Sequence, residues 1–174
     1  MFSDNATISI GVSVKRSGGI SVLLDDQIVF CAPVKFEITE IRRSAERLFS
    51  SIRVFGSQSA LEQIYACVDG NTDFERQIGV WQGVLSEHGA SVIPVDTRSW
   101  YHAVVSPYME RLDCKNNTIE VVIHVAQLLA PECEKIFSLQ GFAESFHLAR
   151  YSRMVSRELM RVQLKRKLNN EQCH

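Results

Sequence analysis

The sequence predicts an α/β fold: a mixed five-stranded sheet flanked by helices, with a long helix at the C-terminal end. Three segments with strand character open the chain, at residues 6–14, 18–24 and 27–34. Helical and strand patterns then alternate, and helices dominate the last part of the chain. With 174 residues the chain is long enough for one domain with a sizeable core, so we expect a single domain over residues 1–174.

The first half of the chain supplies most of the predicted sheet. Ser17-Gly18-Gly19 and Asp25-Asp26 are the turns that join the first three strands. Residues 38–55 are predicted to be helical because apolar side chains recur there at helical spacing. Residues 62–68 read as a short buried strand that ends at Asp69-Gly70.

The second half is predicted to be mainly helical. A helix is predicted over residues 73–88, with Asp73 as its N-cap and Gly89 as its stop, and a fifth strand follows at residues 91–95. Further helices are expected around residues 98–112, 118–129 and, as a long basic helix, about 141–168.

Composition narrows the class of protein. The hydrophobic content of 45% and the charged content of 22% are ordinary for a globular protein, and no apolar run approaches the ~20 residues of a membrane span. The first ten residues lack the basic and apolar regions of a secretion signal. The five cysteines are widely spaced without a Cys-x-x-Cys pair, which argues against a zinc site or a disulfide framework. We therefore expect reduced thiols and a cytoplasmic protein, in the host cytoplasm if the chain is viral.

The net charge of −1 hides an uneven distribution. The segment after Glu144 carries seven basic and two acidic residues, a net charge of +5, which leaves −6 for the rest of the chain. A basic segment on an acidic body suggests a localised anion-binding face. A solvated helix with long cationic side chains is the simpler alternative.

Several stretches together resemble the RuvC-type Holliday-junction resolvases, particularly the small phage-type members. The similarity covers roughly residues 8–153, and the stretches are GVSVKRSGGISVL, IYACVDG, RQIGVWQGVLSEHGASVIPVDTRSW, AQLLAPE and GFAESFHLARYSR. Each motif alone is weak, and their shared order and spacing carry the resemblance. It implies an RNase H-like fold.

The resemblance also implies a catalytic centre of four carboxylates around two divalent metal ions. In this chain the four positions fall on Ser13, Asp69, Gln140 and Glu144, with Cys67 as the alternative to Asp69 if the strand register shifts by two. Ser13 and Gln140 carry no charge, and Mg²⁺ prefers anionic oxygen ligands. We therefore expect a degenerate centre that is inactive or severely impaired, and no cofactor; Mg²⁺ or Mn²⁺ is expected only if the site is active.

An altered metal centre is the alternative. His147 follows Glu144 by three residues on a helix, so Asp69, Glu144 and His147 can be drawn as a carboxylate–imidazole site for Mn²⁺ or Zn²⁺. Glu-x-x-His on a helix is common by chance, which favours a surface histidine.

Nucleic-acid contacts do not need the metals, because they come from Lys and Arg side chains on phosphates. The candidates are two residues of the first turn and four arginines spaced by three, four and four: Lys15, Arg16, Arg150, Arg153, Arg157 and Arg161. Arg42, Arg43 and Arg47 form a further basic group. The alternative is that the arginine stripe pairs with acidic groups of this chain or of a neighbouring one.

Three functions follow from these patterns. The first is a non-catalytic module that binds DNA or another structured nucleic acid, the second is a structural or adaptor subunit in a protein assembly, and the third is an active metal-dependent junction endonuclease. The resemblance also implies a homodimer. The apolar surface of residues 73–88, broader than one core stripe needs, is the candidate interface.

Overall fold

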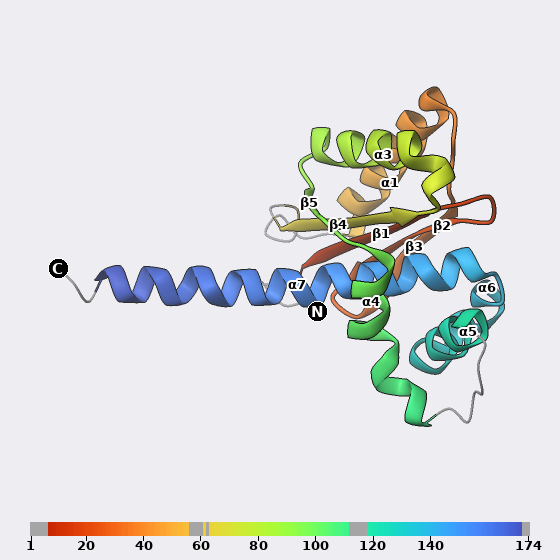
Figure 1. The fold of residues 1–174 in the computed structure, drawn as a ribbon. Helices are drawn as coiled ribbons and strands as arrows, with labels where there is room; N and C mark the ends of the chain where they lie inside the picture. The colour runs from red at the N-terminus through yellow and green to blue at the C-terminus, as the bar shows by residue number, and fades with distance from the viewer. Residues whose placement is uncertain (1–6, 56–60, 62, 112–117, 172–174) are drawn as a thin grey trace.

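One mixed sheet organises the elements of the chain (Figure 1). The computed structural model describes residues 7–55, 61, 63–111 and 118–171. The strands are β1 (Ile8–Val14), β2 (Gly19–Leu24), β3 (Gln27–Pro33), β4 (Ile64–Gly70) and β5 (Ser91–Ile93). The helices are α1 (Ile38–Phe55), η1 (Thr72–Phe74), α3 (Glu75–Glu87), α4 (Thr97–Val104), η2 (Ser106–Arg111), α5 (Thr118–Leu129), η3 (Pro131–Cys133), α6 (Glu134–Phe137) and α7 (Gln140–Glu171).

The strand order is β3-β2-β1-β4-β5. The first three strands pair in antiparallel fashion, and β1–β4 and β4–β5 pair in parallel. The predicted α/β class, with five strands in a mixed sheet and a long C-terminal helix, is thereby confirmed. Asp25 has a φ of 55° in the second turn, a left-handed conformation that Asp tolerates better than most residues. None of the described helices combines the length and apolarity needed to cross a membrane.

The two faces of the central strand β1 differ in side-chain size. On one face the large apolar side chains of β1, including Ile10 and Val12, pack against α1 and α3. Alternation along the strand puts Ser9, Gly11 and Ser13 on the opposite face, under α7. These small residues let α7 lie directly on the central strand.

Glycines fix the height of α7 above the sheet. A Cβ on Gly11 would lie 1.9 Å from the carbonyl oxygen of Ser145, and one on Gly141 would lie 1.8 Å from that of Ser17. Gly18 and Gly141 also form an isolated parallel bridge. The first turn of α7 is therefore seated on the β1–β2 turn, next to the end of β1.

The helix predicted over residues 73–88 begins later and is more deeply buried than expected. Asn71, not Asp73, accepts the capping hydrogen bond, from the backbone N of Asp73 (3.3 Å), and the short η1 precedes α3. Trp81 is fully buried, and its Nε1 donates to the carbonyl oxygen of Lys35 (3.0 Å). Trp81, Val84 and Leu85 are buried against the sheet, whereas Ile78 and Val80 are only partly buried, so a dimer interface on this helix stays a prediction.

Prolines explain two other differences from the predicted elements. The helix expected over residues 98–112 is divided into α4 and η2, because Pro107 lacks the backbone N–H that would continue the α-helical hydrogen bonds. β5 ends at Ile93, immediately before Pro94, two residues earlier than predicted. Pro131 begins η3, which the sequence reading left out together with α6.

Candidate functional site

Two of the predicted site residues lie side by side at one edge of the sheet. Ser13 of β1 and Asp69 of β4 are register partners in the parallel pair. Because parallel strands end at the same edge, both side chains reach the crevice beyond the strand ends, where open α/β sheets bind ligands. Cys67, the alternative to Asp69, lies beside Gly11 instead, and burial raises the pKa of its thiol to about 12.

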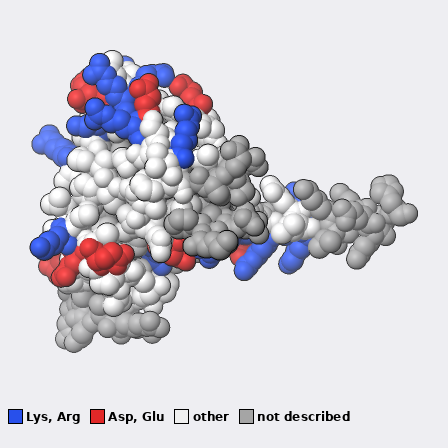
Figure 2. Space-filling view, turned by 180° about the vertical axis from the view of Figure 1, so that it is seen from behind, with Lys and Arg blue, Asp and Glu red and all other residues white. Residues whose placement is uncertain are grey.

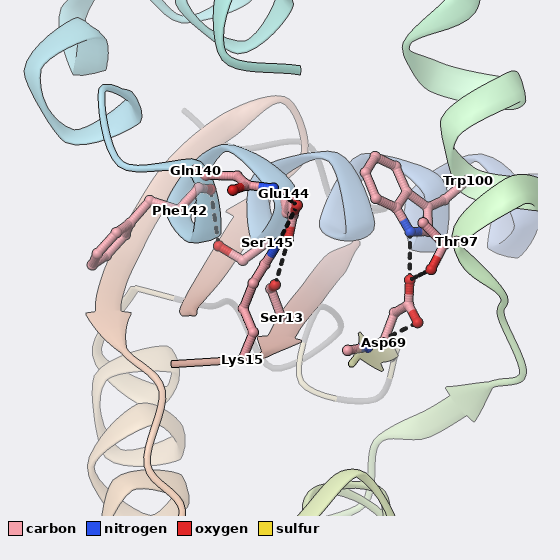
Figure 3. Close-up of polar contacts among 10 residues, drawn as sticks. Ser13, Lys15, Asp69, Thr97, Trp100, Gln140, Phe142, Glu144 and Ser145 are labelled. Carbon is pink, nitrogen blue, oxygen red and sulfur yellow. Dashed lines mark hydrogen bonds and ion pairs between the residues drawn. The ribbon is translucent and has the colours of Figure 1, made fainter. Parts of the chain in front are cut away.

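The first turn of α7 brings the other two predicted residues to the same place (Figure 3). Ser13 Oγ donates to Glu144 Oε2 (2.8 Å), and Gln140 Nε2 donates to Glu144 Oε1 (2.7 Å). Lys15, just past the end of β1, forms an ion pair with the same Glu144 carboxylate. Glu144 therefore has an ammonium group, a hydroxyl and an amide as neighbours.

Asp69 belongs to a second group of contacts. Its Oδ2 accepts hydrogen bonds from Thr97 Oγ1 and Trp100 Nε1, each 2.7 Å long, and its Oδ1 accepts from the backbone N of Gly70 (2.8 Å). Figure 3 shows this carboxylate turned toward α4 and away from Glu144. Sequence reasoning noted Trp100 only as part of a motif and missed Thr97, although both follow the fifth strand at the same edge of the sheet.

Residues of both groups, though not Gln140, line one pocket of about 280 Å³ beyond the strand ends. Its walls include Ser13, Lys15, Asp69, Trp100 and Glu144. The structure thus gathers the predicted positions, but it satisfies both carboxylates with donors from the chain itself. A pair of divalent ions requires several anionic oxygens with free lone pairs. This donor set does not fit two metal ions, because Lys15 supplies the positive charge at Glu144.

His147 is not part of this pocket, so the proposed Asp69–Glu144–His147 metal site was wrong. The His147 side chain is fully buried under α5, where Nε2 lies 2.9 Å from the carbonyl oxygen of Val122 and the ring stacks on Trp100. The described part of the chain holds no group of three or more His, Cys, Asp or Glu side chains placed to bind a metal. Core packing between α7 and α5 decides the direction of this ring, and sequence spacing alone does not show it.

Burial of His147 predicts a pH-dependent stability. Desolvation, the largest cause, lowers the pKa of His147 from 6.5 to about 3 in the folded state. Between these values only the unfolded chain binds the proton, so stability contributed by the neutral ring is complete above about pH 6.5 and falls as the pH drops toward 3, by ~1.4 kcal/mol per pH unit. Urea denaturation from pH 7 to 4 measures this loss. A His147→Gln variant should show a smaller pH slope, and an equal slope would contradict the assignment.

The predicted arginine stripe runs from the body of the fold onto the projecting part of α7. Arg150 donates to the carbonyl oxygen of Val104 (3.1 Å) and to Tyr108 Oη (3.3 Å). Arg153 is 6% exposed and forms an ion pair with Asp26 of the β2–β3 turn. The alternative prediction, that these arginines form ion pairs with acidic groups of the same chain, is therefore confirmed for Arg153.

The other basic candidates are exposed. Arg161 pairs with Glu158 on its own helix (2.5 Å), and Arg157 makes no ion pair with a described residue. Arg16 is exposed in the β1–β2 turn, whereas Lys15 is half-buried by its contact with Glu144. Arg150, Arg153, Arg157 and Arg161 all line a second pocket, of about 380 Å³, between α7 and the α4–η2 segment.

No protein-family model matches this chain, and neither does any curated protein at the level of similarity that indicates a relative. The likeness to RuvC-type resolvases is carried by the motifs and the order of elements alone. The chemistry of the two pockets is consequently the basis for a function.

Proposed function

We propose that this chain is a non-catalytic, RuvC-like nucleic-acid-binding module that contacts branched or duplex nucleic acid, DNA in the first instance, through the basic side of α7. The observation that carries the proposal is the Lys15–Glu144 ion pair at the end of β1. It places a fixed ammonium group where a metal-dependent nuclease needs an empty, anionic pocket. The proposal takes the resemblance as its starting point.

The chemistry of phosphodiester cleavage supports the non-catalytic part. Metal ions lower the pKa of the attacking water and stabilise the leaving oxygen. Here Ser13 contributes a neutral hydroxyl, and Glu144 is already bonded to Lys15, Ser13 and Gln140. Asp69 is held by Thr97 and Trp100. A metal ion would have to displace the Lys15 ammonium group from Glu144 and break several hydrogen bonds, and it would gain contact with only two carboxylates in return.

The shape and charge of α7 support the binding part. The helix continues beyond the sheet as an isolated arm, and Figure 2 shows Lys and Arg side chains along it. Arg157, Arg161 and Lys165 are exposed and recur at intervals of four residues, so they lie on one side of the arm. At 1.5 Å per residue they span ~12 Å, enough to meet several phosphates of a duplex, which carries one charge per ~1.7 Å of axis.

An adaptor subunit is the second candidate, and it has its own support. Arg153 and Arg161 already pair with carboxylates of this chain, which reduces the charge available to nucleic acid. The arm also exposes Leu159, Val162 and Leu164, apolar side chains that a protein partner can cover. A homodimer is part of the proposal only through the resemblance; on α3 the partly buried Ile78 and Val80 are the apolar side chains left for such an interface.

The proposal predicts that the purified protein does not nick a four-way junction above background in Mg²⁺ or Mn²⁺. The cause is the neutral Ser13 together with the Lys15–Glu144 pair. Denaturing gels with a labelled junction, at protein concentrations that saturate binding, provide the measurement. Metal-dependent symmetric nicking that Asp69→Asn abolishes would refute the non-catalytic assignment.

A triple variant, Ser13→Asp with Lys15→Ala and Gln140→Asp, tests the same argument in reverse. It restores two carboxylates and removes the ammonium group, so it should gain a Mg²⁺-dependent increase in thermal stability, ~1.4 kcal/mol when Mg²⁺ is at ten times its dissociation constant. The matched control, Lys15→Ala alone, should show a smaller gain because it lacks the added acids.

A further inference from the structure

The second pocket has an unusual balance of charge. Four arginines line it, together with the carboxylates Asp26 and Glu158, so its walls carry a net charge of +2. Ala103, Pro107 and Tyr108 complete one side. Three separate parts of the chain meet here: α7, the α4–η2 segment and the β2–β3 turn. The cluster is therefore a product of the fold and not of one helix face.

Arg153 is the buried element of this pocket. Its side chain is 7% exposed, whereas that of its partner Asp26 is 85% exposed. The Arg153 Nε has no hydrogen-bond partner within the described part of the chain. Burial is the main cause that lowers the pKa of Arg153, and the nearby Arg157 lowers it further while Asp25 opposes the shift. A buried guanidinium with a spare donor and a like-charged neighbour favours an additional anion.

The remaining arginines differ in freedom. Arg150 is held in place by Val104 and Tyr108, and its guanidinium also lies 5.5 Å from the centre of the Tyr108 ring. Arg157 is exposed and makes no ion pair with a described residue, so it can turn toward a ligand without losing a partner. The pocket thus has Arg150 and Arg153 held by contacts within the chain, Arg161 paired with Glu158, and Arg157 exposed without an ion pair to a described residue.

We propose that this pocket binds a phosphate monoester dianion, with Arg153 and Arg157 as its main ligands and with Asp26 as the group that the phosphate displaces from Arg153. A monoester carries a charge of about −1.5 to −2 at pH 7, which matches the walls of the pocket. Arg–phosphate pairs are charge-assisted and often bidentate, which suits the free Nε of Arg153. A phosphodiester within a strand fits less well, because it carries a single negative charge. It is also linked to a sugar on each side, so the strand would have to leave the pocket in two directions.

The phosphate can come from the end of a nucleic-acid strand or from a free phosphorylated small molecule. The first source rests on the proposed function and deepens it, because a strand end in this pocket would direct the rest of the strand along the arm of α7. The second source needs no nucleic acid. Both sources present the same phosphate monoester group to the pocket, and the experiment distinguishes them by the probes it uses.

The test uses the full chain and three probes: inorganic phosphate, and two duplexes that are identical except for a 5′-phosphate or a 5′-hydroxyl. Titration calorimetry with inorganic phosphate should show binding that Arg157→Gln weakens at least tenfold. Arg153→Gln should abolish it, and Asp26→Asn should strengthen it several-fold because a competing carboxylate is lost. Arg43→Gln, an exposed arginine on α1, is the control and should change nothing. The 5′-phosphate should tighten duplex binding about tenfold in the wild type.

Arg157 and Asp26 are exposed, so their variants test the pocket even if Arg153→Gln does not fold. Phosphate affinity that is unchanged in Arg157→Gln and Asp26→Asn would overturn the inference. Equal binding of both duplexes with no binding of inorganic phosphate would overturn it too, while leaving the proposed function intact. Phosphate binding without binding of either duplex would support the pocket, assign it to a small phosphate monoester, and count against the proposed function.

Discussion

Replacing Gly11 by alanine is expected to destabilise the fold by about 3 kcal/mol, the upper end of the usual cost of forcing an extra carbon into a packed core. The new Cβ would lie 1.9 Å from the Ser145 carbonyl oxygen and 2.4 Å from the Ala149 backbone nitrogen. Both are backbone atoms of α7, so no side-chain rotation relieves the contact, and the helix has to move away from β1. Guanidinium denaturation monitored by circular dichroism gives the change in the free energy of unfolding.

Gly79 and Gly83 on α3 provide the matched control. A Cβ at either position meets no heavy atom within 4 Å, and both glycines lie inside a helix. Alanine there should stabilise the protein by up to ~1 kcal/mol, because glycine loses more backbone entropy in a helix. A Gly11→Ala variant as stable as the wild type would mean that α7 does not rest on β1, and the positions of Gln140 and Glu144 would then lose their support.

A triple variant of the projecting arm, Arg157→Gln with Arg161→Gln and Lys165→Gln, should lose about a hundredfold in affinity for duplex or branched DNA at ~150 mM salt. Each lost phosphate contact costs about 1 kcal/mol or somewhat more. Fewer counterions are also released, so the slope of log K against log salt should become less negative by roughly 2.7. Fluorescence anisotropy with a labelled junction over a series of salt concentrations measures both effects.

The control for this variant removes the same charge elsewhere. Arg42, Arg43 and Arg47 are exposed on α1, and Arg42 pairs with Glu87 (2.8 Å). Figure 2 shows basic side chains mixed with acidic ones over this end of the molecule. Their triple replacement by glutamine should reduce affinity only slightly. If the two variants bind equally well, the arm has no special role, and net charge alone governs binding.

The hydrophobic periodicity and the turn residues of the sequence were sufficient to predict the strands of the sheet. Strand alternation in β1 and the apolar run of β4 led to the correct elements, and the parallel register then brings Ser13 and Asp69 together. The predicted limits of α1 and α5 agree with the structure because their apolar faces are regular. The long basic helix, predicted as 141–168, extends over Gln140–Glu171.

The details of the site depended on packing and were not predictable from the sequence. Lys15 lies near Glu144 only because Gly18 and Gly141 allow the first turn of α7 to rest on the β1–β2 turn. His147 turns into the core because α5 covers that side of α7. Asp26 meets Arg153 across a sequence distance that no local pattern connects. Contacts between distant segments decided each of these points.

The most direct test of the central claim is a titration of a labelled four-way junction with the wild-type protein, in EDTA and in Mg²⁺, from 50 to 300 mM salt. If the arginine and lysine side chains alone make the contacts, binding should be equally tight in EDTA and in Mg²⁺, and the junction should stay intact. The binding constant should also fall with salt at a log–log slope of roughly −3. Absence of binding to both DNA and RNA at low salt would contradict the account in favour of the adaptor function. Binding that needs Mg²⁺ and ends in cleavage would contradict it in favour of an active nuclease.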